Sequence, residues 1–195
     1  MTFIKPITLK GQYATLEPLA PEHVDELKLA VADGELWKLW YTFIPKPQDM
    51  SVEIERRLDL QNQGVWAPFS IRNNDSNTIC GMTNYMNIDA SNRRVEIGGT
   101  WCAKSVQRTS VNTECKLMLL THAFENLKCI SVEFRTNFMN QQSREAIARL
   151  GAKQDGILRN HMLNSDGSYR DTVVFSIIES EWPTVKSHLK HKLSR

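Results

Sequence analysis

Short stretches rich in apolar residues, each bounded by turn-forming residues, recur along the chain and predict β-strands. In the first, residues 8–19, apolar and polar positions alternate around Gly11, which predicts an opening strand or hairpin. Further strands are expected at residues 67–71, 78–87, 95–102, 130–136, 157–162 and 169–178. Between the last two, the sequence Asn-Ser-Asp-Gly at residues 164–167 predicts a hairpin turn.

Other segments have the periodicity and end signals of helices, at residues 21–33, 51–62, 113–127, 143–150 and 179–193. Pro21 and Ser51 stand at helix starts, and Gly151 ends the fourth helix. In residues 113–127, four apolar side chains share one stripe, namely Leu117, Leu120, Phe124 and Leu127. Strands dominate the middle of the chain and alternate with helices toward the end, so we expect a mixed sheet with helices on both faces.

The composition narrows the protein class. With 195 residues, 41% of them hydrophobic, the chain fits a single domain over residues 1–195. A net charge of +2 argues against a dedicated nucleic-acid or membrane surface. No apolar run approaches the ~20 residues of a membrane span, and the first residues lack a signal-peptide core, so a cytoplasmic protein is expected. The cysteines, Cys80, Cys102, Cys115 and Cys129, form no CxxC pair, which favours buried thiols over a metal site.

A polar turn at residues 107–113, Gln-Arg-Thr-Ser-Val-Asn-Thr, leads from a strand into the most periodic helix. The first N–H groups of a helix have no partner in the chain and the helix dipole is positive there, so this turn is a ready anion site. A phosphate-bearing ligand is the first hypothesis. A solvated turn with an ordinary helix cap is the competing interpretation.

Two further motifs follow this turn. Asn140 and Ser143 fall three residues apart at the start of a helix that ends in Gly151, and residues 159–176 form the terminal hairpin. In order and spacing, the three motifs resemble the GNAT superfamily of acetyl-CoA-dependent N-acetyltransferases, in particular its ribosomal-protein N-terminal (RimJ/RimL-type) branch. The resemblance covers about residues 8–182. It implies an α/β (mixed α+β) fold with a central twisted mixed sheet of about six or seven strands and helices on both faces.

The resemblance also implies where acetyl-CoA binds. The family's pyrophosphate loop is Gln/Arg-x-x-Gly-x-Gly/Ala, and this chain departs from it by having Ser110 and Asn112 at the two small positions. In the family, the end of the preceding strand pairs with the pantetheine, and the Asn-x-x-Ser residues approach the pantetheine and the thiol. The implied cofactor-binding residues are Trp101, Cys102, Ala103, Gln107, Arg108, Thr109, Ser110, Val111, Asn112, Thr113, Asn140 and Ser143.

Acyl transfer to an amine needs the amine in its neutral form. An α-amine with a pKa of ~8 is about 10% neutral at pH 7, whereas a lysine is well under ~0.1% neutral, so a modest base suffices only for the α-amine. Glu96 is the first candidate, because relatives often place a glutamate on this strand, although a surface ion pair with Arg93 or Arg94 is equally consistent. His161 is the second candidate, and a structural histidine is its simpler interpretation.

The helix after Asn140 lacks the tyrosine that many relatives use as an acid, so Ser143 is expected to donate a hydrogen bond to the leaving sulfur. Trp40 and Tyr41 belong to an aromatic cluster that borders the acceptor site in the family, and each ring could equally be core. Homodimers are common among relatives, and a homodimer is expected here by analogy alone.

The sequence leaves three functions open. The first is an N-acetyltransferase that transfers acetyl from acetyl-CoA to a primary amine, either a protein N-terminus or a small amine, without a covalent enzyme intermediate. The second is a GNAT-fold protein that binds acyl-CoA or a partner with little transfer activity, which the departures at Ser110 and Asn112 motivate. The third is transfer of a longer acyl group, such as succinyl.

Overall fold

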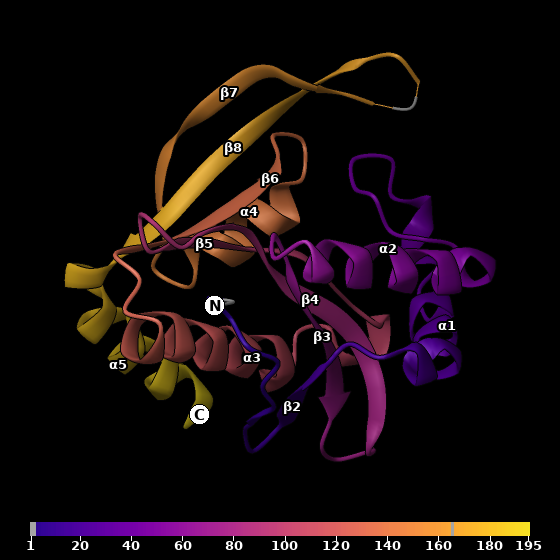
Figure 1. The fold of residues 1–195 in the computed structure, drawn as a ribbon, viewed down its shortest axis with the longest axis horizontal. Coiled ribbons are helices and arrows are strands. Elements are labelled where there is room, and N and C mark those ends of the chain that lie inside the picture. Colours follow the sequence, from indigo (N-terminus) through magenta and orange to yellow (C-terminus); the bar gives the residue numbers. More distant parts are fainter. Residues whose placement is uncertain (1–2, 165) are drawn as a thin grey trace.

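The computed structural model describes residues 3–164 and 166–195, and in them eight strands form one continuous mixed sheet. The order across the sheet is β1-β2-β3-β4-β5-β6-β8-β7 (Figure 1). The strands are β1 Leu9–Lys10, β2 Ala14–Pro18, β3 Ala67–Asn73, β4 Thr78–Asp89, β5 Arg94–Cys102, β6 Ser131–Asn137, β7 Lys153–Leu163 and β8 Tyr169–Ile178. The pair β5 and β6 is parallel, and the other pairs are antiparallel.

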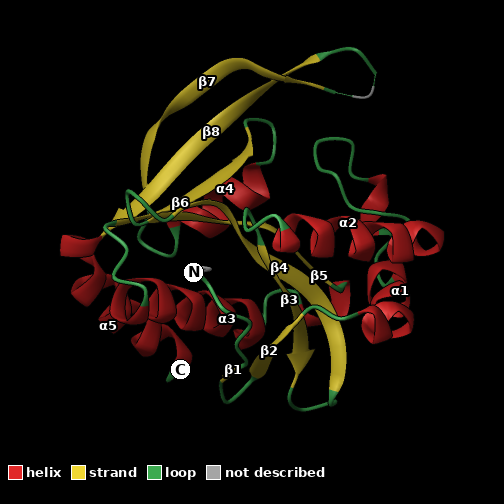
Figure 2. Cartoon of the chain, in the orientation of Figure 1, coloured by secondary structure: helices red, strands yellow, loops and turns green. Residues whose placement is uncertain are grey.

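The α-helices lie on both faces of this sheet (Figure 2). They are α1 Val24–Ala32, α2 Met50–Asn62, α3 Ser110–Thr121, α4 Gln141–Ala148 and α5 Trp182–Leu193. Successive strand residues point to opposite faces, so contacts of neighbouring β4 residues assign the helices to faces. Asn84 Oδ1 accepts a hydrogen bond from Arg57 of α2 at 3.0 Å, whereas the Tyr85 hydroxyl donates to the Leu119 carbonyl of α3 at 2.5 Å. Helix α1 packs beside α2, and α5 packs beside α3.

Helix α3 is also tied to the first hairpin. The Glu114 carboxylate accepts hydrogen bonds from the backbone N–H groups of Gln12, Tyr13 and Ala14 at 2.7–2.8 Å. The turn must approach this carboxylate closely, because a Cβ on Gly11 would lie 2.3 Å from the Glu114 carboxyl carbon. The alternation around Gly11 therefore corresponds to the hairpin of β1 and β2.

The expected mixed sheet with helices on both faces is confirmed. The sheet has eight strands in the described residues, against the six or seven expected, and the opening segment alone contributes both β1 and β2. Helix α3 begins at Ser110, three residues before the predicted start at residue 113, because Thr109 serves as its N-cap. It ends earlier as a regular α-helix, and a π-helical turn over His122–Asn126 continues it.

The cysteines are all buried free thiols, as expected. In the described residues no helix has both the length and the apolar character that a membrane crossing requires. The last hairpin, β7 and β8, extends away from the helices (Figure 1), and its β7 strand is exposed along nearly its whole length.

Candidate functional site

Strands β5 and β6 pair over only three residues and then diverge. The parallel register joins Arg94, Val95 and Glu96 to Ser131, Val132 and Glu133, and it stops there although both strands continue. From Ile97 to Cys102, β5 keeps its partner β4 on one side and has none on the other. Main-chain N–H and C=O groups on that side are therefore available to an extended ligand.

The predicted pantetheine strand, Trp101 to Ala103, turns its groups alternately to the two sides. The Ala103 N–H donates to the Cys80 carbonyl at 2.8 Å, so it faces β4 and is already used. The N–H of Cys102 consequently faces the open side. The Cys102 carbonyl faces the same way and accepts a hydrogen bond from Gln107 Nε2 at 3.0 Å, which holds the predicted pyrophosphate turn against the strand.

A bulge lies at the point of divergence. Gly99 has φ +58°, and a Cβ there would lie 2.5 Å from Asn84 Nδ2, so only glycine fits without strain. Asn84 Nδ2 donates to the Gly98 carbonyl at 2.9 Å, and Asn84 Oδ1 accepts from Arg57. Arg57 in turn bonds Glu53 at 2.7 Å. This chain from Glu53 through Arg57 and Asn84 to Gly98, hereafter the bulge network, is buried from end to end.

Glu96 is the last β5 residue paired with β6, and the residue is 5% exposed. Its Oε2 accepts a hydrogen bond from Asn87 Nδ2 at 2.7 Å and lies 3.6 Å from Arg135 Nε. Its Oε1 is directed toward the bulge, since a Cβ on Gly98 would fall 2.9 Å from it. The alternative interpretation, a surface ion pair of Glu96 with Arg93 or Arg94, is not among the ion pairs of the described residues, and Arg94 pairs with Glu133.

The environment of Glu96 suits a proton acceptor. Burial raises the pKa of the Glu96 carboxyl above its usual range, while the Asn87 hydrogen bond and the Arg135 charge oppose the rise. A carboxylate with a raised pKa is a stronger base, and one oxygen remains directed at the bulge. A cavity of about 180 Å³ adjoins it, and Asn87, Glu133 and Arg135 contribute to the lining.

The turn at residues 107–113, predicted to bind the pyrophosphate, is built as a helix start. Thr109 Oγ1 caps α3 by accepting from the Val111 N–H at 3.4 Å and donates to the Val106 carbonyl at 2.7 Å. Arg108 has φ +64°, which a residue other than glycine adopts only at some cost. Ser110 is partly exposed at the first helical position, and Thr113 also lies within the first turn of α3. The turn therefore combines a regular cap with the orphan N–H groups of a helix start.

Asn140 and Ser143 lie at the start of α4, as predicted. Asn140 is the N-cap, and its Oδ1 accepts a hydrogen bond from the Ser143 N–H at 3.0 Å. Ser143 thus takes part in the helix cap through its backbone N–H, and its side-chain hydroxyl remains available to bond a ligand. Helix α4 begins at Gln141, two residues earlier than expected, because this cap is already in place.

The aromatic pair differs from a core pair. Trp40 is 64% exposed and packs edge-to-face on the half-buried Tyr41, with ring centroids 5.6 Å apart. His161 lies in an irregular part of β7, where residues 159–161 stand opposite a single β8 residue. Its Nδ1 is 3.1 Å from Thr172 Oγ1. The bulge needed to turn His161 toward the sheet face of Glu96 is therefore present.

Some polar residues near the site were not found from sequence. Lys116 of α3 is 6% exposed, and its Nζ donates to Thr100 Oγ1 at 2.7 Å and to Thr83 Oγ1 at 3.4 Å. Burial lowers the pKa of the Lys116 ammonium from 10.5 to about 8. The sequence feature that could have pointed to Lys116 is a lysine beside the apolar stripe of this helix. Asn84, Asn87 and Arg135 gave no signal, because their roles depend on contacts between distant strands.

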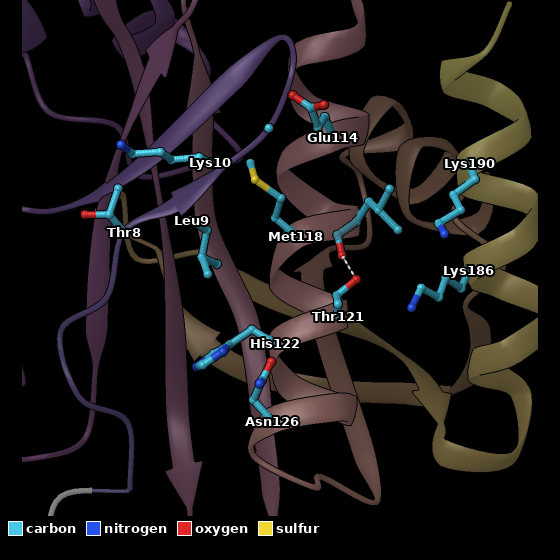
Figure 3. A pocket seen from close by; sticks show the side chains of 12 residues that line it. Thr8, Leu9, Lys10, Glu114, Met118, Thr121, His122, Asn126, Lys186 and Lys190 are labelled. Carbon is cyan, nitrogen blue, oxygen red and sulfur yellow. Dashed lines mark hydrogen bonds between the residues drawn. The ribbon is translucent and has the colours of Figure 1, made fainter.

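A wide cavity of about 500 Å³ lies elsewhere, between β1, α3 and α5 (Figure 3). None of the predicted site residues lines it. Glu114 in its wall is saturated by three backbone N–H groups, and Lys186 pairs with Glu125. These two charged groups already have partners, and the cavity holds no carboxylate besides Glu114. In the described residues, no group of three His, Cys, Asp or Glu side chains is arranged to hold a metal ion.

Comparisons with known proteins point in one direction. A family model described as an acetyltransferase (GNAT) domain matches residues 14–153. A Bacillus subtilis (strain 168) protein, YdaF, whose name describes a ribosomal N-acetyltransferase, is 27% identical over 179 residues, covering 88% of this chain and 94% of that one. A GCN5-related N-acetyltransferase structure from Brucella melitensis has 30% identity and a TM-score of 0.86, covering 96% of this chain and 86% of that chain. The fold is also similar to Mycobacterium smegmatis RimJ in complex with CoA-disulfide, at 20% identity and a TM-score of 0.80, covering 97% and 96% of the two chains.

Proposed function

This chain belongs to the GNAT family of acetyltransferases, and from that premise we propose that it transfers an acetyl group from acetyl-CoA to a primary amine. The observation that carries the proposal is the divergence of β5 from β6 immediately after Glu96. It provides an unpaired strand edge for an extended cofactor arm beside a buried carboxylate with one oxygen directed at the bulge.

In the proposed reaction, the open edge of β5 holds the pantetheine, with the Cys102 N–H among its donors. The pyrophosphate lies against the start of α3, where dipole and N–H groups contribute ~0.3–1 kcal/mol, or up to ~2 kcal/mol if partly buried. The residues proposed for this contact are those of the turn, residues 107–113. Asn140 and Ser143 lie at the thioester end.

The chemistry is direct attack of the amine on the thioester carbonyl. Glu96 takes the amine proton, directly or through a water molecule, which is worth about 10²–10⁴-fold in rate. A backbone N–H beside the bulge stabilises the oxyanion, and the Ser143 hydroxyl donates a hydrogen bond to the leaving sulfur. No covalent enzyme intermediate is needed because the thioester is already activated. His161 is the alternative base, since it faces the same side of the sheet through Thr172.

The acceptor we favour is the α-amine of a protein N-terminus. An α-amine needs only about 1.4 kcal/mol to reach its neutral form at pH 7, against about 4.6 kcal/mol for a lysine. The name of the YdaF relative supports a ribosomal protein as the acceptor. Trp40 and Tyr41 are proposed to contact the acceptor, because exposed aromatic side chains suit a cation or an apolar side chain.

The decisive experiment is titration calorimetry with acetyl-CoA, followed by assay of thiol release with amine acceptors. Ser110→Trp places an indole at the first position of α3, and Ser187→Trp places the same group on the exposed face of α5 as the control. We expect binding in the wild type and the control and its loss in Ser110→Trp. Binding without thiol release for any amine would instead favour an acyl-CoA-binding protein, and no binding by the wild type would refute the proposal.

A further inference from the structure

Arg170 of β8 is an unusual arginine. Its Nε is shielded from water and has no hydrogen-bond partner among the described residues. Its side chain takes part in none of the ion pairs that connect those residues, although the residue is only partly exposed. An arginine that gives up hydration without gaining a partner is destabilising, so such a group calls for an explanation.

The register of the sheet locates Arg170. Thr172 pairs with Asn137, the last residue of β6, and Arg170 precedes Thr172 by two residues in β8, on the side of the hairpin turn. Side chains two residues apart share a face, and Glu133, Arg135 and Asn137 of β6 lie on it too. Since Glu96 pairs with Glu133, Arg170 is on the Glu96 face, beyond the point where β6 ends. The charges of Arg170 and Glu96 influence each other.

Arg170 stands outside the ion pairs around Glu96. Glu133 forms ion pairs with Arg94 and Arg135, and Glu96 lies 3.6 Å from Arg135. These two carboxylates and two arginines are paired with one another, whereas Arg170 forms no ion pair with any of the described residues. Its distance from Glu96 exceeds that of an ion pair, so the internal carboxylates leave its N–H groups unused.

We propose that Arg170 is the receptor for a carboxylate carried by one of the two substrates, held on the Glu96 face of the open sheet. The proposal rests on the proposed acetyltransferase function and names the chemical class of substrate that the same site prefers. A guanidinium presents planar paired donors that match a carboxylate, and a partly dehydrated one binds it more strongly than a fully solvated one.

A carboxylate on either substrate would bind the Arg170 guanidinium in the same way. It belongs either to the amine acceptor, as the α-carboxylate of an amino acid or the side chain of an acidic second residue, or to the acyl donor, as in succinyl-CoA. In each case the carboxylate lies on the part of the substrate that reaches the Glu96 face. Arg170 neutralises its charge, and Glu96 stays available to accept the amine proton.

The test compares matched substrate pairs by thiol release. The acceptor pairs, each with acetyl-CoA, are free serine against serinamide and a Ser-Asp tetrapeptide against its Ser-Asn counterpart. The donor pair is succinyl-CoA against acetyl-CoA with a neutral amine. Each pair is assayed with wild type, Arg170→Gln and Arg170→Lys. Arg159→Gln is the control, because Arg159 lies on the same hairpin, is 79% exposed and pairs with Asp171.

We expect the carboxylate-bearing member of one pair to be favoured at least 10-fold in kcat/KM by the wild type and by Arg159→Gln. Arg170→Gln removes that preference through KM and leaves the uncharged member unaffected, while Arg170→Lys restores part of it. A preference that survives in Arg170→Gln, or no preference in any pair, overturns the proposal while transfer itself persists. Absence of thiol release with every pair refutes the transferase function and this proposal with it. Acetyl-CoA calorimetry on each variant confirms that it is folded.

Discussion

The two edges of β5 meet very different surroundings. Toward β4, its pairing extends from Arg94 to Cys102, with register shifts at the bulge and between Glu96 and Arg94. Toward β6, the pairing stops after Glu96. On the closed edge, the bulge network supplies a partner for each polar group, from Glu53 to the Gly98 carbonyl. On the open edge, main-chain groups are left for a ligand.

Buried side-chain polar atoms without a hydrogen-bond partner occur outside the bulge network. In the described residues, the buried side-chain polar atoms without a partner are Trp101 Nε1, Asn112 Oδ1 and Arg170 Nε. Trp101 is on the unpaired length of β5, Asn112 is in the first turn of α3, and Arg170 is on the Glu96 face of β8. Unsatisfied polar atoms in a folded protein are costly, so a ligand that bonded these atoms would compensate for the cost. Strand β5 is thus held by β4 and the bulge network on one edge and leaves its other edge open to a ligand.

The largest effect should come from the residue where the open edge begins. We expect Glu96→Gln to lower kcat about 10²–10⁴-fold with acetyl-CoA affinity unchanged, because the amide cannot accept the amine proton. Burial raises the pKa of Glu96, so the wild-type kcat should fall as the pH decreases through a value above 4.5, and the variant should lack this limb. Glu55→Gln, on the exposed side of α2, is the control. Unchanged turnover across the pH range would remove Glu96 from the mechanism and leave His161.

On the closed edge, the strongest test compares two neighbouring arginines that bond the same carboxylate. Arg57→Ala should destabilise the fold by about 1–3 kcal/mol, because Glu53 keeps its bonds to Arg56 whereas Asn84 Oδ1 is left buried without a partner. Arg56→Ala should cost under about 1 kcal/mol, because the Arg56 side chain is 45% exposed. Denaturant unfolding measures both. Equal costs would show that the bulge network does not support β5.

A smaller effect is expected beneath the strand, at Lys116. Lys116→Met should raise the free energy of unfolding by about 1–2 kcal/mol at pH 7, because the pKa of about 8 shows that burial penalises the Lys116 ammonium. The two threonines that lose this donor, Thr83 and Thr100, can still bond each other. The folded pKa lies below the unfolded value, so the advantage is full below pH 8 and disappears toward pH 10.5.

Unfolding of both proteins should be measured at pH 7 and pH 9. At each pH, the quantity to compare is the difference in unfolding free energy between the wild type and Lys116→Met. Buried thiols such as Cys80, whose pKa is raised to about 12, lower the stability of both proteins above pH 9. An advantage that does not shrink between these two values would contradict the explanation.

The smallest effect concerns the exposed aromatic pair. Trp40→Ala should raise the acceptor KM a few-fold while leaving the acetyl-CoA KM and the unfolding free energy unchanged, because the ring is 64% exposed and contacts little besides Tyr41. Leu29→Ala, at another exposed apolar side chain, is the control for stability. A change in stability alone would make Trp40 a packing residue.

Much of the fold was predictable because local patterns agree with it. Thr109, Asn140 and Gly151 mark helix ends through chemistry that involves only nearby residues, and the alternation around Gly11 reports the first hairpin. Boundaries were less accurate: α3 and α4 begin two or three residues early, since a cap lies outside the apolar stripe that signals a helix. The irregular pairing of residues 159–161 in β7 has no local signature.

By itself, the sequence determined the order of the elements, the glycine that follows α4 and, through resemblance, the strand and turn expected to hold acetyl-CoA. Only the tertiary structure decided how each polar residue is used. Glu96 is buried away from Arg93, Lys116 is enclosed beneath Thr100, and Arg170 is left without a partner. The reason is physical, since capping and periodicity act over a few residues, whereas burial and charge pairing depend on strands that are distant in the chain.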